Sequence, residues 1–475
     1  MAVKLRKPIL VGGISLSFGL WLWQNLQQSV FEVGEVSMVG AIALASGWWY
    51  LQQKLTKPQK TVLSPINQEK LEKAIASVKH TITYLETEAP AQDISNLQQK
   101  LVELPELTNR QTLQIAVTGG KNSGKTTLTQ LLQNLGIGEN ITFRETPPLF
   151  TEIDTETTAA LELTNVADLV LFIVTGDLTE SQLQIIQQLW EKHQHIMLIF
   201  NKQDQYILEE RGVIWEQLKY RVKDIIPPEN IVTISAAPAA VKVRQHQTDG
   251  STKEWLEQQK AELGNLGDRL REITTKEKEQ LVLAATWRAA IELKNEAKNH
   301  LNKVRKIRAL PIIEKYQWVV AISTFANPVA ALDLLATAAI NTQMLIDLSE
   351  IYQQKLSLSQ AQTGSGTIAK LMVKLGLVEL STQTIGSMLK TNAITYVAGG
   401  TVQGISAAYL TRLAGLSLIE YCQEQETITE GFNLENLGEK LQKVWQENQR
   451  TAFLQGFIKQ AKNCLSVNTN QTVIN

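Results

Sequence analysis

The chain has 475 residues, more than a single compact core usually organises, so we expect several domains. Its 46 basic and 47 acidic residues give a net charge of −1, and this balance excludes a broadly basic binder of nucleic acid. The 2 cysteines and 5 histidines lack the spacing of metal ligands, which excludes a disulfide framework and a zinc module.

Two uncharged segments, 8–31 and 36–53, lie near the start of the chain. Each is about long enough to cross the ~30 Å hydrocarbon core of a bilayer as a helix. Basic residues flank the pair, whereas the loop between holds only Glu32 and Glu35, so both ends should face the cytoplasm or an equivalent compartment. The sequence therefore predicts a transmembrane helical hairpin at 1–60 and an integral membrane protein with the lipid bilayer as a partner. A cleaved signal peptide is the alternative.

Residues 61–110 form the next predicted unit, a helical stalk or linker. Apolar residues recur at helical spacing in two runs, separated by Pro90 and ended by Pro105. The first run shares one helical face and consists of Leu71, Ile75, Val78, Ile82 and Leu85.

Short apolar strands alternate with amphipathic helices over residues 111–255. The strands read LQIAV, DLVLFIV, HIMLIF and NIVTIS. This alternation predicts βαβ units, and hence an α/β fold with a mostly parallel sheet flanked by helices.

A glycine-rich motif, Gly119-x-x-x-x-Gly124-Lys125-Thr126, follows the first of these strands and precedes a helix. That context is typical of a phosphate loop, whose backbone amides and helix N-terminus surround phosphate groups. Lys125 would contact the β- and γ-phosphates, and the hydroxyl of Thr126 would bind Mg²⁺. The predicted loop residues are Gly119, Gly120, Lys121, Asn122, Ser123, Gly124, Lys125, Thr126 and Thr127.

A second motif, NKQD at 201–204, ends the strand HIMLIF. The carboxylate of Asp204 would accept hydrogen bonds from the guanine ring, which adenine cannot donate. Lys202 would lie along the base and Asn201 would support the phosphate loop. Ser235 and Ala236, in ISAA at 234–237, would contact the guanine oxygen through a backbone amide. Together these motifs predict GTP and GDP as ligands.

With these motifs, residues 111–240 resemble an Era-like GTPase of the translation-factor-related class. The helical region behind them, including NPVAALDLLATAAINTQMLIDLSEIY at 327–352, resembles a YcjF-like domain. The resemblance implies a third element, Asp-x-x-Gly, for which DTET at 154–157 is the best match, with Asp154 as a Mg²⁺ ligand. Thr157 stands where that element has glycine, and Thr158 stands where many relatives carry a water-orienting Gln.

The resemblance also implies two further roles near the phosphates. A switch threonine should bind Mg²⁺. Thr146 is preferred to Thr142 because it follows Lys125 at about the sequence separation that the switch threonine has in the family. Members of the class with Asn at position 122 can hold a potassium ion that supplies positive charge in the transition state. Asn122 and Lys125 are therefore the predicted catalytic residues, with Mg²⁺ and K⁺ as the ions.

The rest of the chain is predicted to be helical. We expect long connecting helices at 256–315, a hydrophobic all-α domain at 316–425 and a helical tail at 426–475. Polar residues such as Asp333 and Asp347 favour a buried core or shallow insertion over further spanning helices. The region is preceded by a basic cluster that would face anionic lipid or solvent, formed by Lys303, Arg305, Lys306, Arg308 and Lys315.

Three functions are compatible with this organisation. The first is a membrane-anchored GTP-binding protein that hydrolyses GTP slowly and acts as a switch through its helical domain. The second is a dynamin-like GTPase that self-associates and remodels membranes, and the third is a nucleotide-binding scaffold that does not hydrolyse GTP. The sequence identifies no protein effector, and no nucleic-acid partner is expected.

Overall fold

The structure is a computed structural model in which residues 65–138, 140–151, 154–246, 252–326, 330–391, 399–424, 434–449 and 451–472 are described. Its contacts divide the chain into two compact units, Met1–Pro65 and Ile66–Asn475, and every described residue except Pro65 belongs to the second unit.

A five-stranded parallel sheet forms the centre of the α/β part. Its strands lie in the order β2-β1-β3-β4-β5, and each neighbouring pair is parallel. They are β1 (Leu113–Gly119), β2 (Ile141–Glu145), β3 (Leu169–Val174), β4 (His195–Phe200) and β5 (Ile231–Thr233). Every residue of β3 is buried, as expected of a parallel strand covered on both faces. The predicted parallel sheet flanked by helices is therefore present.

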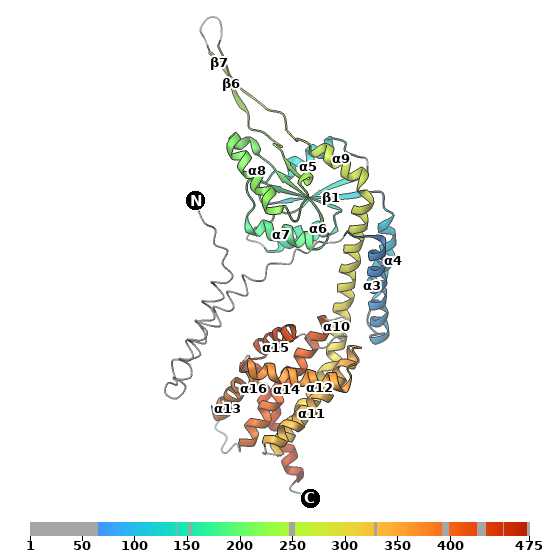
Figure 1. The fold of residues 1–475 in the computed structure, drawn as a ribbon, viewed down its shortest axis with the longest axis vertical. Coiled ribbons are helices and arrows are strands. Elements are labelled where there is room, and N and C mark those ends of the chain that lie inside the picture. The colour runs from blue at the N-terminus through green and yellow to red at the C-terminus, as the bar shows by residue number, and fades with distance from the viewer. Residues whose placement is uncertain are drawn as a thin grey trace, which may run out of the picture. The chain divides into compact units, whose positions relative to one another are not determined.

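Helices cover both faces of this sheet (Figure 1). Buried residues of α5 (Lys125–Asn134) and α9 (Leu266–Lys276) share one hydrophobic cluster with β1, β3 and β4. Those of α6 (Asp154–Val166), α7 (Glu180–Glu191) and α8 (Leu208–Val222) share a second cluster on the opposite face. Apolar residues from both faces of the central strands therefore hold the layers together.

The edge strand β2 runs parallel to β1 with Leu113 opposite Ile141 and Val117 opposite Glu145. Since the two strands start together, the connection from α5 returns to the amino-terminal edge of the sheet, where the amide of Leu113 donates to the carbonyl of Asn140 at 2.8 Å. Glu145 ends β2 opposite Val117, two residues before β1 ends at Gly119.

Three helices form a second packed body: α3 (Gln68–Glu88), α4 (Ser95–Thr108) and the long α10 (Lys278–Ala326). Asn67 caps α3 by accepting a 2.9 Å hydrogen bond from the amide of Lys70. Glu88, at the end of α3, binds Arg305 at 2.7 Å and Arg308 at 2.9 Å on α10. Two residues of the predicted basic cluster are therefore engaged in an ion pair within the protein.

The C-terminal helices bury a third cluster together with the second half of α10. They are α11 (Ala330–Ile351), α12 (Leu358–Lys374), α13 (Leu377–Thr391), α14 (Gly399–Glu424), α15 (Leu434–Asn448) and α16 (Thr451–Thr472). A Cβ added to Gly404 on α14 would lie 2.8 Å from the carbonyl oxygen of Ala321 on α10. Glycine thus permits close packing of these two helices.

A two-stranded antiparallel hairpin, β6 (Val241–His246) and β7 (Thr252–Glu257), joins β5 to α9 (Figure 1). Every residue of β7 is exposed. The sequence patterns do not predict this hairpin, because β7 lacks the apolar alternation that marks a half-buried strand and in β6 only Val241 and Val243 show it.

The prediction of an integral membrane protein is not supported by the structure. Among the residues that the structure describes, no helix combines the length and apolar character needed to span a bilayer. The hairpin predicted at 1–60 lies outside the described residues. In the hydrophobic C-terminal region, the carboxylate of Asp347 accepts hydrogen bonds from Tyr316 at 2.6 Å and from Gln343 at 2.8 Å. Such polar groups, satisfied within the protein, are consistent with a helical body packed upon itself.

Candidate functional site

The glycine-rich loop connects the end of β1 to the start of α5, and two of its glycines are required by their surroundings. Gly119 has φ 154°, and a Cβ there would lie 2.5 Å from the carbonyl oxygen of Ile173. Gly124 has φ 95°, and a Cβ there would lie 2.3 Å from Nδ2 of Asn201. No other residue type fits either position without a shift of the backbone.

Asn201 links the loop to two other segments. Its Nδ2 donates to the carbonyl of Ser123 at 2.9 Å. Its Oδ1 accepts from the amides of Lys202 at 2.8 Å and Ala236 at 3.0 Å. The structure therefore brings the glycine-rich loop, the NKQD segment and the ISAA segment together around one buried amide side chain.

Lys125 lies under the loop and is only 6% exposed. Its Nζ donates to the carbonyls of Gly119 at 3.2 Å and Gly120 at 2.9 Å. Burial lowers the pKa of Lys125, and the nearby Glu145 carboxylate partly opposes that shift. A cation held on the backbone carbonyls of the loop can bind an anion that enters the loop.

The other loop residues differ in exposure. Lys121 and Asn122 are exposed, and Asn122 has a left-handed backbone with φ 58°. Ser123 is 4% exposed, and its hydroxyl has no hydrogen-bond partner in the described part of the chain. A buried hydroxyl without a partner costs free energy, so the loop retains an unused hydrogen-bond donor.

Asp204 and its neighbours follow β4 in the short 3-10 helix Gln203–Gln205. Lys202 precedes this turn with φ 63°. The carboxylate of Asp204 accepts a 3.1 Å hydrogen bond from the amide of Ala239. The backbone of Ser235 forms two hydrogen bonds with the backbone of Glu262, of 2.7 and 2.9 Å.

Glu145 is the site residue that the sequence patterns miss. The hydroxyl of Thr126 donates to Oε1 of Glu145 at 2.8 Å. The contact arises because β2 pairs with β1 in parallel and ends beside the loop. The sequence does contain a relevant feature, since Glu145 is the last residue of the strand ITFRE. However, Glu-Thr-Pro-Pro at 145–148 does not match the pattern Asp-x-x-Gly.

The two threonines considered as metal ligands bond to groups other than Thr126. Thr146 is 2% exposed, and its hydroxyl donates to the hydroxyl of Thr118 at 2.9 Å. Thr142 lies near the start of β2 and donates to the carbonyl of Leu113 at 3.1 Å. Asp154 begins α6, and its side chain is outside the described part of the structure. The structure thus brings Glu145, and neither threonine of this segment, to Thr126.

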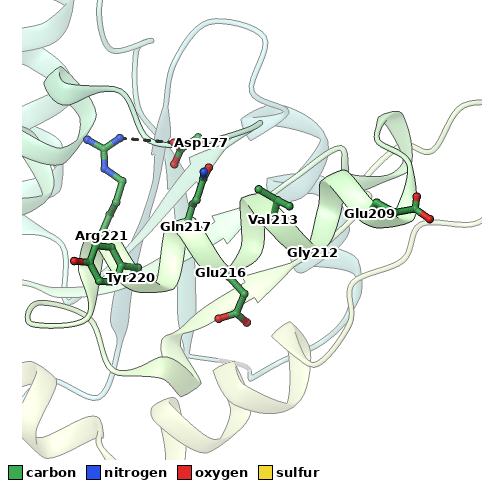
Figure 2. A pocket seen from close by; sticks show the side chains of 8 residues that line it. All are labelled: Asp177, Glu209, Gly212, Val213, Glu216, Gln217, Tyr220 and Arg221. Atoms are coloured by element: carbon green, nitrogen blue, oxygen red, sulfur yellow. Dashed lines mark ion pairs between the residues drawn. The ribbon is translucent and has the colours of Figure 1, made fainter. Parts of the chain in front are cut away.

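A shallow hollow of about 930 Å³ lies on a different surface, along α8 (Figure 2). Figure 2 shows Arg221 directed toward Asp177, whose carboxylate lies 3.8 Å from the guanidinium. Tyr220, Val213 and Glu216 extend along the helix on the same hollow. None of its lining residues belongs to the glycine-rich loop or the NKQD segment.

Comparison with known proteins gives one domain match. Residues 288–450 match the family described as a domain of unknown function, DUF697. They overlap the region whose sequence resembles a YcjF-like domain, so the helical part of the chain is a recognised domain type. The match spans fewer than half of the residues and does not by itself assign the whole chain to a family. No curated protein matches the chain.

Two solved structures are similar to parts of this chain. A crystal structure of a variant of a protein named SsGBP has 19% identity and a TM-score of 0.22, and the match covers 33% of this chain and 64% of that one, less than two thirds of its length. An oligomerised bacterial dynamin pair, described as a mechanism for long-range sensing and tethering of membranes, has 12% identity, a TM-score of 0.26 and coverage of 88% and 83%. Both TM-scores are too low to support an argument about this chain.

Proposed function

We propose that this chain binds GTP and GDP and hydrolyses GTP slowly. The observation that carries the proposal is the position of Asn201, which bonds to the glycine-rich loop through Ser123 and to the ISAA segment through Ala236. One side chain thereby fixes the distance between a phosphate-binding loop and a base-reading segment, as a nucleoside phosphate requires. The loop would hold the phosphates through its backbone amides and Lys125, and Asp204 would recognise guanine.

Magnesium fits the oxygen atoms at Thr126 and Glu145. Mg²⁺ is usually held by one or two carboxylates together with substrate phosphates, and a hydroxyl and a carboxylate 2.8 Å apart supply suitable ligands. Bound magnesium would neutralise charge on the phosphates. The hydroxyl of Thr126 would bind the ion, and the carboxylate of Glu145 would contribute negative charge. Asp154 stays a proposed ligand on the basis of the sequence, and Thr146 would have to leave Thr118 to become one.

The base preference rests on Asp204, whose carboxylate presents only hydrogen-bond acceptors. Guanine offers two adjacent donors to it, while adenine offers an acceptor at the ring nitrogen. Asp204 is partly buried in the structure, and a bound base would cover its carboxylate further. A carboxylate left unpaired beneath adenine would cost about a few kcal/mol, which corresponds to discrimination of about a hundredfold or more. Asp204→Asn replaces one acceptor by a donor and should favour xanthine nucleotides.

Binding of fluorescent GDP, XDP and ADP to the wild type and Asp204→Asn tests this function. We expect the wild type to bind GDP at least a hundredfold more tightly than ADP, and the variant to prefer XDP. Asp268→Asn, at an 86% exposed side chain on α9, is the matched control and should retain the guanine preference. Equal affinity of the wild type for GDP and ADP would refute the assignment.

Hydrolysis is proposed to be slow because Thr158 stands where many members of the class that the sequence resembles carry a water-orienting Gln. Asn122 would hold a potassium ion that supplies the missing positive charge. A scaffold that binds without hydrolysis remains the contrasting hypothesis, and single-turnover hydrolysis with radiolabelled GTP separates the two.

A self-assembling, dynamin-like GTPase is the second candidate function. It is favoured by α10, which packs against the sheet domain through Leu281 and Val282 and contributes Ile313 and Ala321 to the C-terminal cluster. A single helix could transmit a change at the sheet to the helical body. GTP turnover that rises steeply with protein concentration would support self-association, whereas a specific rate independent of concentration would exclude it.

A further inference from the structure

The segment after β2, residues 146–149, continues along the end of β1 and the start of the glycine-rich loop. The amide of Thr146 donates to the carbonyl of Val117 at 3.0 Å, and the amide of Leu149 donates to the carbonyl of Gly119 at 3.1 Å. A parallel bridge pairs Leu149 with Gly120. The two residues between are prolines, which have no amide hydrogen. All amide donors of the segment are therefore absent or bonded to the backbone beside them.

Side chains fix the same segment. Leu149 is 1% exposed and belongs to the cluster on the α6, α7 and α8 face of the sheet. The hydroxyl of Thr146 bonds to Thr118 on β1 at 2.9 Å. Pro147 and Pro148 further limit the backbone, because each ring fixes its own φ. Movement of this segment would break two backbone hydrogen bonds and expose a buried leucine.

A protein distinguishes GTP from GDP only through interactions that differ between the two bound states. The third phosphate adds negative charge and acceptor oxygens, so discrimination needs donors that it alone reaches. Residues 146–149 border the phosphate loop, but their amides are bonded or absent and the hydroxyl of Thr146 already donates to Thr118. The groups in or beside the loop that can respond to the charge of the third phosphate are therefore Lys125, Thr126 and Glu145.

We propose that residues 146–149 form a fixed wall that does not respond to the γ-phosphate, so that this segment stays unchanged when GTP replaces GDP and adds nothing to the preference between them. This inference rests on the proposed guanine-nucleotide function. It assigns Pro147 and Pro148 a specificity role, because they remove the amides through which the strand end would otherwise contact the third phosphate.

Hydrogen exchange on the full chain, followed by mass spectrometry of a peptide covering Phe143 to Thr151, tests the wall directly. We expect the amide of Leu149 to be protected in the nucleotide-free protein and equally protected with GDP or with GTPγS. Protection that rises with GTPγS alone would overturn the proposal.

The double variant Pro147→Ala, Pro148→Gly supplies the missing amides and loosens the wall. We expect faster exchange at Leu149 and a ratio of GTPγS to GDP affinity that changes at least fivefold from the wild-type ratio. Pro228→Ala, at the start of the 3-10 helix Pro228–Asn230, is the control and should change neither quantity. An unchanged ratio in the loosened double variant would refute the role of the prolines. If the wild type binds neither nucleotide, the proposed function fails instead, while the protection of Leu149 can still be measured.

Discussion

Arg288 of α10 donates a 2.6 Å hydrogen bond from Nη2 to the carbonyl oxygen of Ala167, just beyond the C-terminal end of α6. The same guanidinium donates to Asn165 at 3.2 Å and to His193, beyond the end of α7, at 2.9 Å. Helix C-termini carry partial negative charge, so one buried cation satisfies two of them. Burial lowers the pKa of Arg288 to about 10, which leaves it charged at neutral pH. The contact joins the sheet domain to the long helix.

Replacement of Arg288 by methionine should destabilise the protein by about 2 to 4 kcal/mol, because the partly buried carbonyls of Asn165 and His193 lose this donor and the buried carbonyl of Ala167 keeps only Gln194. Chemical denaturation followed by tryptophan fluorescence measures the loss. Arg271→Met is the control, since Arg271 pairs with an 86% exposed Asp268 at 3.1 Å and such pairs contribute about 1 kcal/mol or less. Equal losses in the two variants would show that the carbonyl contacts add nothing.

Gly124→Ala should weaken GDP binding at least tenfold, equivalent to about 1.4 kcal/mol. The added methyl would lie 2.3 Å from Nδ2 of Asn201 and would disfavour φ 95°, so Asn201 must release Ser123. Isothermal titration with GDP gives the affinity, and circular dichroism verifies the fold.

Gly212→Ala is the matched control for that substitution. Gly212 lies within α8, and a Cβ there meets nothing within 4 Å. Alanine should leave GDP affinity unchanged and raise helix stability by about 0.5 to 1 kcal/mol. A similar loss of affinity in both glycine variants would mean that Asn201 does not position the loop.

Parts of the site that depend on local backbone geometry are predictable from sequence. Glycines at 119 and 124 and the tetrapeptide at 201–204 have fixed spacing, and the structure places them around one amide side chain. Glu145 is different, because its contact with Thr126 depends on the register of two strands. No local pattern states that β2 pairs with β1 in parallel.

The surroundings of charged residues are equally hard to predict. Arg305 has the sequence context of a solvated helix face, yet its partner Glu88 lies 217 positions away and both side chains are 10% exposed. Long-range packing decides whether such a charge faces water, lipid or a carboxylate. The hairpin of β6 and β7 is missed for a different reason, because exposed β7 has no apolar alternation and the alternation in β6 is limited to Val241 and Val243.

Acidification should destabilise the sheet domain through His195 at the start of β4. Burial lowers the pKa of His195 to about 4, and the charge of Arg288 adds to the effect. The unfolded chain takes up a proton near its ordinary pKa of about 6.5, while the folded chain does not, so stability is lost as the pH falls from about 6.5 toward about 4. The full loss is on the order of 3 kcal/mol.

Denaturation midpoints between about pH 4 and pH 7 measure this dependence. His195→Asn should flatten it, because the amide does not titrate. The same substitution at His80, which packs edge-on against Tyr84 on α3, is the matched control for replacing a histidine outside the sheet domain. A slope that survives in His195→Asn would place its origin in other groups.

Potassium should accelerate GTP hydrolysis, and Asn122 should be the residue through which it acts. Without a water-orienting side chain, turnover in sodium should be on the order of 10⁻⁴ to 10⁻³ per second. An ion held by Asn122 beside the β- and γ-phosphates would stabilise the charge that develops there. Exchange of sodium chloride for potassium chloride at constant ionic strength should raise single-turnover hydrolysis severalfold.

The left-handed backbone of Asn122, with φ 58°, decides which substitution tests this role. Alanine would remove the side chain and also strain the loop, whereas glycine removes the side chain and accepts the same φ. Asn122→Gly should therefore reduce the ratio of rates in potassium and sodium to about one, with each rate normalised to bound nucleotide. A ratio that stays severalfold in Asn122→Gly would move the potassium site elsewhere, and equal rates in both salts for the wild type would leave a partner protein as the source of the missing positive charge.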